Sequence, residues 1–302
     1  MNPHLTDEQI LDLQIKATDV RMSIIESLAA TKTDKYQASG HTAGPLGMAD
    51  IFTLLYFHSM NHDPKNPTWP ERDRLILSNG HICPVLYAVM AHSGYFPIEE
   101  LKTLRHFGSR LQGHPHREFL PMVESSSGPL GCGLSQAVGM AIADRINGGD
   151  KKFYVMMGDG EQDEGNVWEA ALLAGKEKLR NIVAIVDRNF IQIDGDTEDI
   201  LPLGDLTKKY EEFGWHAQEV DGHNLQEIND AINRAHAVAN KPSIIIAITV
   251  PSKGVKSFEG DYRWHGAPPG SGPEDKVPKA KQKEVALAEL QEIKDELLKS
   301  KK

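Results

Sequence analysis

The sequence is poor in several residues that large classes of protein depend on. Cysteine occurs only twice in 302 residues, as Cys83 and Cys132, without a Cys-x-x-Cys pair. Two cysteines are too few for a disulfide framework or a cysteine-based zinc site, so we expect two buried or half-buried thiols in a reducing cytosol. No apolar run approaches the ~18 residues of a membrane span, and the N-terminus lacks the basic start and apolar core of a signal peptide. We therefore expect a cytoplasmic protein that does not contact membranes.

Basic residues are also scarce, with 33 Lys and Arg against 43 Asp and Glu and a net charge of −10. A nucleic-acid surface needs a basic patch, so we expect no nucleic-acid partner, and any anion site must be local. The composition is otherwise that of a globular protein, and the length allows one large domain or two small ones.

Helix-like and strand-like segments alternate along most of the chain. The expected strands lie at 75–77, near 151–158, and at 182–186, 215–220 and 243–250. The expected helices lie at 6–30, 48–60, from 82 onward, from 96 to an irregular stretch near 112–116, and at 134–146, 206–213 and 225–239. This alternation predicts an α/β fold, a three-layer α/β/α domain with a mostly parallel sheet covered on both faces.

We assign residues 1–275 to this domain and residues 276–302 to a charged helical tail. The tail is rich in Lys and Glu and places Leu287, Leu290 and Ile293 at helical spacing. Such a segment is most simply a solvated surface helix or linker, and packing on a partner subunit is the alternative.

The strongest local signal lies in residues 151–195. Asp159 stands between two glycines after an apolar run, and Asn189 ends the next apolar run 30 positions later. In a parallel sheet these two strand ends lie side by side, so the two side chains could share one cation. The glycines allow close approach to a phosphate, and a helix directly after them would offer free N–H groups. Gly-Asp-Gly alone is usually a turn, but this context makes a magnesium diphosphate the simplest ligand.

Four loops rich in glycine hold a histidine each: His41, His81, His114 and His265. Any one of them alone is most simply a polar cap or a structural residue. Four of them, together with the cation motif in one domain, are hard to explain by structure alone.

A further Gly-rich loop spans residues 125–133 ahead of a helix. It could cradle a phosphate or pack a helix closely, and the sequence favours neither. It lacks the Lys-Ser/Thr ending of a nucleoside-triphosphate loop and does not follow a clear strand, which argues against a P-loop and against a dinucleotide fold.

Taken together, these motifs resemble the N-terminal, diphosphate-binding half of the transketolases, which depend on thiamine diphosphate. The matching segments are 39–41 with 44–50, 72–74 with 77–81, 113–115, 128–131, 158–160 with 164–165, 189–195 and 265–268. Their order and joint presence make the resemblance specific, and it implies the thiamine-diphosphate-binding fold.

The resemblance implies a role for each residue at the diphosphate. Asp159, Asn189 and the main-chain carbonyl of Ile191 would bind Mg²⁺ or Ca²⁺. His81 and Gly160 would contact the diphosphate, as would His265.

The resemblance also places residues around the rest of the cofactor and the sugar. Gly128, Pro129 and Leu130, with Ile191, would line the thiazolium pocket. His41, His114 and His265 would face the sugar as catalytic residues. The implied activity is transfer of a two-carbon ketol unit from a ketose phosphate such as xylulose 5-phosphate to an aldose phosphate such as ribose 5-phosphate, a reaction of the pentose phosphate pathway.

Three departures limit what carries over from the family. Thr42 stands where the family often has proline, and residues 251–254 replace a more Gly-rich loop; both could alter sugar preference. The third is the pyrimidine-binding domain, whose glutamate activates the cofactor and which this sequence lacks. Three nearby acids, Glu161, Asp163 and Glu164, are expected on the diphosphate side, out of reach of the pyrimidine.

The third departure implies a separate partner chain. A C-terminal, pyrimidine-binding transketolase subunit would supply the glutamate, in a heterotetramer with two copies of each chain. The alternatives are a two-carbon transferase acting on another sugar, an enzyme like deoxyxylulose-phosphate synthase, or a non-catalytic thiamine-diphosphate-binding module.

Overall fold

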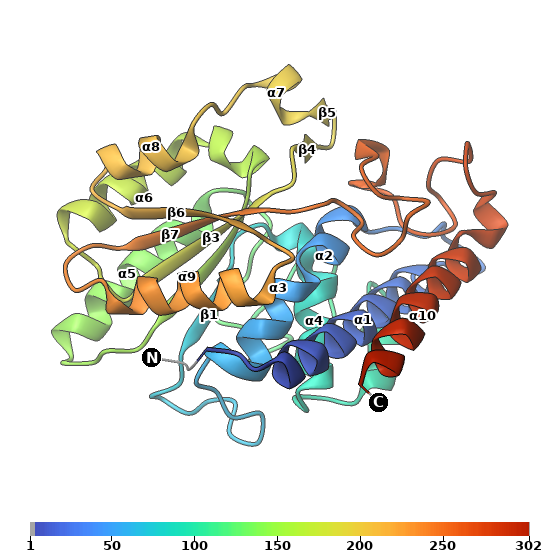
Figure 1. Cartoon of the computed structure of the whole chain (residues 1–302), viewed down its shortest axis with the longest axis horizontal. Coiled ribbons are helices and arrows are strands. Elements are labelled where there is room, and N and C mark those ends of the chain that lie inside the picture. The colour runs from blue at the N-terminus through green and yellow to red at the C-terminus, as the bar shows by residue number, and fades with distance from the viewer. Residues whose placement is uncertain (1–3, 302) are drawn as a thin grey trace.

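The computed structural model describes residues 4–301 and is built around one five-stranded sheet (Figure 1). The strands run in the order β1 (Arg74–Leu77), β2 (Phe153–Gly158), β3 (Ile182–Arg188), β7 (Ser243–Ile248) and β6 (His216–Asp221). All neighbouring strands are parallel. Their carboxyl ends therefore meet at one edge of the sheet, where the chain leaves each strand for a loop.

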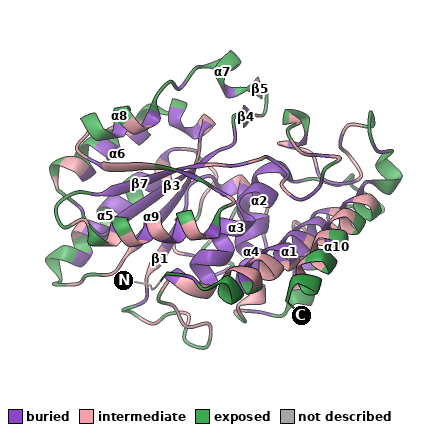
Figure 2. Ribbon diagram, in the orientation of Figure 1, coloured by how far each residue is buried: buried purple, intermediate pink, exposed green. Residues whose placement is uncertain are grey.

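Alternate residues of each strand face two separate cores, one on each side of the sheet. Tyr154 and Met156 pack in the first core, and Val155 and Met157 in the second. Because both faces are covered, β2, β3 and β7 are buried along nearly all of their length, as Figure 2 shows, whereas the edge strand β6 is mostly partly exposed. The predicted three-layer α/β/α fold is confirmed.

The long helices divide between the two faces. Those that contribute to the first core are α1 (Asp7–Ala30), α3 (Ala49–Leu54), α4 (Cys83–His92) and α9 (Leu225–Ala237). Those that contribute to the second are α5 (Cys132–Ile146), α6 (Gly165–Lys176) and α8 (Leu206–Glu212).

Shorter elements lie in the loops between them. They are α2 (Ala43–Gly47), the π-helix η1 (Leu55–Ser59), the 3-10 turns η2 (Gly80–Ile82), η3 (Ile98–Thr103), η4 (Gly160–Asp163), η5 (Tyr262–Trp264) and η6 (Lys279–Lys281), the short antiparallel strands β4 (Ile191–Gln192) and β5 (Gly195–Asp196), and α7 (Thr197–Ile200).

Two predicted helices differ from the structure. The segment from residue 96 contains only the turn η3 and then irregular chain, because Arg105 and Gly108 take left-handed backbone conformations that end helical structure. After Gly160 the chain forms the short turn η4, and α6 begins only at Gly165. The N–H groups near Asp159 therefore belong to a turn and not to the start of a long helix.

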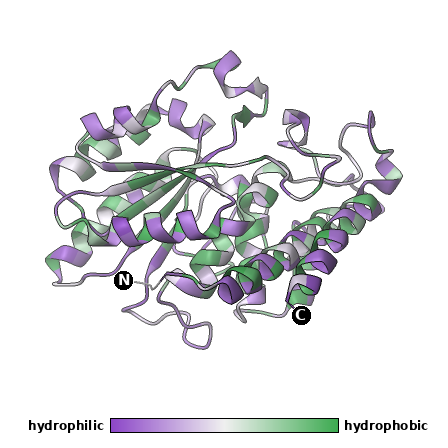
Figure 3. Ribbon diagram, in the orientation of Figure 1, coloured by the Kyte–Doolittle hydropathy of each residue, from purple (hydrophilic) through white to green (hydrophobic). Residues whose placement is uncertain are grey.

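The charged tail forms the helix α10 (Gln282–Ser300), which packs along α1 (Figure 1). Ala286 and Leu290 have no exposed surface and belong to the first core, and Lys294 pairs with Asp19 at 2.7 Å. The prediction of a solvated helix is therefore wrong for this face, which buries the apolar stripe. Figure 3 shows how apolar and polar residues alternate around the helix. The division of the chain at residues 275 and 276 stays a prediction.

Within residues 4–301, no helix combines the length and apolar character needed to cross a membrane. Both cysteines are free thiols, Cys83 buried and Cys132 partly buried, as predicted.

Candidate active site

A cavity of about 300 Å³ opens at the carboxyl edge of the sheet, where β1, β2 and β3 end. The exits of β2 and β3 adjoin directly, because the N–H of Asp159 donates to the carbonyl of Asp187 at 3.1 Å. The cavity is lined by His41, Asn79, His81, His114, Gly128, Leu130, Gly158, Asp159, Gly160, Glu161, Asp187, Asn189, Ile191, Gln192, Ile193 and His265. Of the residues predicted for the site, Pro129 alone is absent from this lining; it is exposed to solvent.

The four loop histidines form one wall of the cavity, which we call the histidine wall (His41, His81, His114 and His265). The His41 ring centroid lies 4.9 Å from that of His81, 5.7 Å from His265 and 6.5 Å from His114. The centroids of His81 and His265 are 5.2 Å apart. The fold thus brings residues separated by more than 200 positions in the sequence into contact range.

Burial keeps these imidazoles neutral. It lowers the pKa of His41 to about 3, with further contributions from His265, Arg105 and His114, and it lowers the pKa of His265 to about 4. The pKa of His81 is well below its usual value for the same reason. At neutral pH each ring therefore has one N–H donor and one acceptor nitrogen, which suits it to bind hydroxyl groups.

Several polar atoms around the cavity have no partner within the protein. Nδ1 of His41 and of His265 is buried without a hydrogen bond, and so are both amide atoms of Asn79. Buried polar groups are almost always paired, so unpaired atoms that line a cavity fit a polar ligand. Asn79 was not among the predicted site residues, although it stands in the tetrapeptide after β1 that includes His81.

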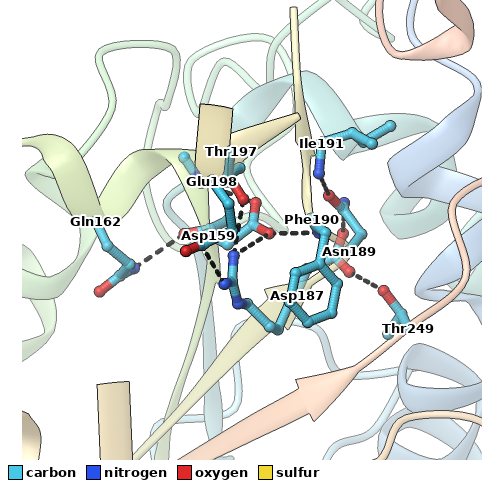
Figure 4. Close-up of polar contacts among 12 residues, drawn as sticks. Asp159, Gln162, Asp187, Asn189, Phe190, Ile191, Thr197, Glu198 and Thr249 are labelled. Carbon is cyan, nitrogen blue, oxygen red and sulfur yellow. Dashed lines mark hydrogen bonds and ion pairs between the residues drawn. The ribbon is translucent and has the colours of Figure 1, made fainter. Parts of the chain in front are cut away.

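A second part of the lining, which we call the strand edge (Asp159, Asp187 and Asn189), is bonded within the protein (Figure 4). Oδ1 of Asp159 accepts from the N–H of Gly160 at 2.8 Å, and Oδ2 accepts from the N–H of Phe190 at 2.7 Å. Arg188 also donates to Oδ2 at 3.3 Å. Burial raises the pKa of Asp159 to about 6, and these donors oppose the rise.

The other two residues of the strand edge are bonded to each other. The amide of Asn189 donates to Asp187 at 2.9 Å and accepts from the N–H of Ile191 at 3.0 Å. Asp187 also accepts from the hydroxyl of Thr249. Burial, reinforced by the charge of Asp159, raises the pKa of Asp187 to about 7.

A cation at the strand edge would have few ligands from the protein itself. No group of three or more His, Cys, Asp or Glu side chains in residues 4–301 could hold a metal ion. Asp159 and Asn189 nevertheless line the same cavity together with Ile191. One carboxylate and neutral oxygens fit Mg²⁺ when substrate or cofactor phosphates supply further ligands, so the residues present are compatible with a metal diphosphate.

Arg188 is a feature of this edge that the motif did not indicate. Its guanidinium donates to Thr197 at 2.9 Å and to Glu198 at 2.5 Å, both in α7, besides Asp159. It also lies 4.0 Å from the ring centroid of Phe190, whose backbone is left-handed with φ 63°. Arg188 therefore ties the strand edge to α7 and partly neutralises Asp159.

Glu161 joins three loops beneath the cavity. One carboxylate oxygen accepts from the hydroxyl of Ser78 and from the N–H of Gly131 at 2.6 Å, and the other accepts from the N–H of Gly158 at 3.0 Å. The sequence placed this acid near the diphosphate without indicating this role, since the partners are distant along the chain. Its carboxylate is fully engaged in holding the frame.

The Gly-rich loop 125–133 lines the cavity at one end and packs closely at the other, so the helix-packing interpretation is confirmed and the phosphate cradle stays a prediction. Gly128 and Leu130 line the cavity. Gly133, in contrast, packs closely on the exit of β1, because a Cβ added there would clash with Cβ of Ser78. One end of the loop thus faces the cavity and the other allows α5 to pack.

Comparison with known proteins places this site in a family. Residues 18–299 match the family described as transketolase, thiamine diphosphate binding domain. The chain is 43% identical over 258 residues to the 6-deoxy-6-sulfo-D-fructose transketolase subunit SqwG of Clostridium sp. (strain MSTE9), covering 85% of this chain and 92% of that protein. It is 39% identical over 292 residues to an apulose-4-phosphate transketolase subunit of Actinobacillus succinogenes, covering 97% of this chain and all of that protein.

One-piece transketolases match over part of their length. Transketolase 2 of Escherichia coli is 41% identical, and the match covers 87% of this chain and 41% of that protein. The crystal structure of transketolase from Campylobacter jejuni superposes with a TM-score of 0.80 and 33% identity, covering 97% of this chain and 48% of that one. The chain therefore belongs to the transketolase family of transferases, through its thiamine-diphosphate-binding domain.

Proposed function

We propose that the chain is the diphosphate-binding subunit of a two-chain transketolase that requires thiamine diphosphate and Mg²⁺ or Ca²⁺. The observation that carries the proposal is the convergence of the histidine wall and the strand edge on one cavity. One wall offers unpaired imidazole nitrogens, and the other offers a carboxylate and an amide at the ends of adjoining strands. A ligand with sugar hydroxyls at one end and a metal diphosphate at the other matches both.

The residues that line the cavity divide between the cofactor and the sugar in this proposal. Asp159, Asn189 and the carbonyl of Ile191 hold the cation, while His81, Gly160 and His265 contact the diphosphate. Gly128 and Leu130 flank the thiazolium ring, which supplies the carbon nucleophile that carries a two-carbon fragment.

The sugar lies against three of the histidines, of which His265 also contacts the diphosphate. His41, His114 and His265 bind its hydroxyls and move protons at their ring nitrogens, which are neutral at the working pH. Because the rings are uncharged, they can accept a proton from a hydroxyl or donate one through N–H without first losing a solvent proton.

We propose that the activating carboxylate comes from another chain. The three acids that line the cavity, Asp159, Glu161 and Asp187, already accept hydrogen bonds from main-chain or side-chain donors. In this proposal all three hold the loops or the cation, so none of them bonds the pyrimidine end of the cofactor. We infer a C-terminal, pyrimidine-binding partner that supplies this glutamate, with two copies of each chain in the assembly. The relatives named as subunits support this arrangement.

The donor and acceptor sugars are inferred from the family. Xylulose 5-phosphate and ribose 5-phosphate are the first pair to test. Two relatives are named for 6-deoxy-6-sulfo-D-fructose and for apulose 4-phosphate, so these two sugars complete the donor panel.

The test is an assay of two-carbon transfer with this chain alone and with the pyrimidine-binding chain from a neighbouring gene. We expect no turnover by the chain alone and turnover in the mixture with thiamine diphosphate and Mg²⁺. Turnover by the lone chain would contradict the two-chain proposal. Cofactor binding without turnover by any mixture or sugar would indicate a non-catalytic binding module.

A further inference from the structure

Arg105 lies between the loops that carry two of the histidines. Each of these histidines follows a glycine, in the pairs Gly40-His41 and Gly113-His114. A Cβ added to Gly113 would lie 2.8 Å from Cζ and Nε of Arg105, and one added to Gly40 would lie 3.9 Å from Nε. The guanidinium thus passes between the two glycines, and the absence of a side chain at Gly113 is what lets it approach.

The guanidinium bonds to both loops. One terminal nitrogen donates to the hydroxyl of Ser39 at 3.5 Å, and the other donates to the carbonyl of Gly113 at 3.3 Å. No carboxylate in residues 4–301 lies within ion-pairing distance of Arg105, in contrast to its neighbour Arg110, which pairs with Glu100 at 2.6 Å. The charge of Arg105 is therefore directed at the histidine loops and not balanced by an acid.

The backbone at Arg105 is strained in a way that fixes this direction. Its φ is 60°, a left-handed conformation that costs roughly 1 to 2 kcal/mol in a residue other than glycine. The N–H of Arg105 donates to the carbonyl of Leu111 at 2.9 Å, and Leu104 and Leu111 are buried. Such conformations persist where the surroundings enforce them, and they concentrate at functional sites.

The positive charge also acts on the imidazoles. Burial lowers the pKa of His114, and the charge of Arg105 lowers it further. The other groups that face this loop are His41, Cys83, whose thiol donates to the carbonyl of Gly113 at 3.2 Å, and Tyr87, whose hydroxyl donates to the carbonyl of Gln112 at 2.9 Å. Arg105 is the cation in this set.

We propose that Arg105 is a positioning residue for sugar binding: its guanidinium braces the His41 and His114 loops against each other and sets the spacing of their rings. This proposal rests on the function proposed above, since it assigns a role within the same site. It predicts that loss of the guanidinium weakens sugar recognition and leaves the cation and diphosphate end unaffected.

The first experiment uses the chain alone and needs no turnover. Proton NMR follows the titration of His114 in the wild type, in Arg105→Gln and in Lys102→Gln, an exposed cation of the same segment outside the site. We expect the pKa of His114 to rise in Arg105→Gln and to stay unchanged in Lys102→Gln. An unchanged pKa in Arg105→Gln, with the fold intact by circular dichroism, would contradict the proposal.

The second experiment uses the reconstituted two-chain enzyme. In Arg105→Gln we expect kcat/KM for the sugar to fall about 10-fold, mostly through KM, with the affinity for thiamine diphosphate unchanged. Arg105→Lys should recover only part of the loss, because a single ammonium cannot bond both loops with the same geometry. If the wild-type enzyme is active and Arg105→Gln has the same kcat/KM for the sugar, the positioning role of Arg105 is refuted and the proposed function stands. If the wild-type mixture is inactive, the proposed function itself is refuted.

A double-mutant cycle separates bracing from a general loss of stability. Gly113→Ala adds a methyl group that displaces the guanidinium without deleting it, so it should also lower kcat/KM for the sugar about 10-fold. In an Arg105→Ala background the same change should have little further effect. Additive losses in the double variant would show that Gly113 and Arg105 act independently and would overturn the proposal.

Discussion

The two walls of the cavity differ in how their polar atoms are satisfied. At the strand edge, Asp159, Asp187 and Asn189 are bonded to one another's loops and to main-chain N–H groups. At the histidine wall, Nδ1 of His41 and of His265 has no partner within the protein. The strand edge is therefore complete as a frame, whereas the histidine wall is arranged for a ligand that is not part of this chain.

This difference implies different responses to mutation. Changes at the strand edge should remove cofactor binding, because the frame presents its oxygens in one fixed geometry. Changes at His41 or His114, the two histidines proposed to contact only the sugar, should spare cofactor binding and damage turnover. Tests that separate binding from turnover therefore decide whether the contrast is real.

The largest effect is expected from Asp159→Ala. Loss of the one carboxylate among the proposed cation ligands should weaken Mg²⁺-dependent binding of thiamine diphosphate by at least about 100-fold, since even indirect supports of metal ligands contribute 10- to 100-fold. Isothermal titration calorimetry on the chain with its partner measures this.

A matched control is Glu198→Gln, which removes the other carboxylate bonded to Arg188. Glu198 does not line the cavity, so its loss should change cofactor affinity little. Unchanged affinity in Asp159→Ala would refute the metal assignment. An equal loss of affinity in both variants would show that Asp159 supports cofactor binding by holding Arg188 and not by binding a cation.

At the histidine wall, His41→Ala should lower kcat by about 100-fold, the usual contribution of a positioned proton-transfer group, while thiamine diphosphate binds as before. The control is His216→Gln on β6, a histidine that is also partly buried, has a lowered pKa and has an unpaired ring nitrogen, but lies outside the cavity. If His41→Ala abolished cofactor binding, His41 would have to be assigned to the cofactor and not to the sugar.

The two walls should also give opposite dependences of stability on pH in the metal-free chain. The pKa of His265 is about 4 in the folded protein and about 6.5 when exposed, so between these values the unfolded chain binds more protons and the free energy of unfolding falls as pH falls. Asp187 has a folded pKa of about 7 against 3.8, so the folded chain binds more protons and stability falls as pH rises through this window.

Urea unfolding at pH 4.5, 5.5 and 7 checks both slopes. His265→Gln should reduce the loss of stability toward acid pH by an amount on the order of 2 kcal/mol, and Asp187→Asn should reduce the loss toward neutral pH. The same change in both variants would contradict the contrast between the walls.

The positions of residues that directly follow strands could be predicted from the sequence. Asp159 and Asn189 end apolar runs, and the adjacency of their strands follows from parallel pairing, which the register of Gly158 opposite Asp187 confirms. The four loop histidines were found because each stands beside glycine in a loop. Burial of apolar runs determines where strands end, so whatever follows them is predictable.

The parts that depend on tertiary contacts were missed. Arg188 meets Glu198 only because α7 folds back over β3, and Glu161 meets Ser78 across 83 positions. The prediction of a helix after residue 96 was wrong because Arg105 has a left-handed backbone, which packing imposes and which the residue does not prefer by itself. Apolar spacing carries no information about such partners.

The smallest effect is expected from a hydrogen bond that joins two loops of the histidine wall. Thr42 is fully buried, and its hydroxyl donates to the carbonyl of Ala267 at 2.7 Å, which joins the loop of His41 to the loop of His265. Thr42→Val keeps the shape and removes this bond, so it should cost about 1 kcal/mol of stability and raise KM for the sugar a few-fold, with cofactor affinity unchanged. Thr18→Val on α1, whose hydroxyl bonds only within its own helix, is the matched control. Equal KM values in the two variants would show that packing alone holds the loops of His41 and His265. The hydrogen bond between Thr42 and Ala267 would then have no part in positioning these histidines for the sugar.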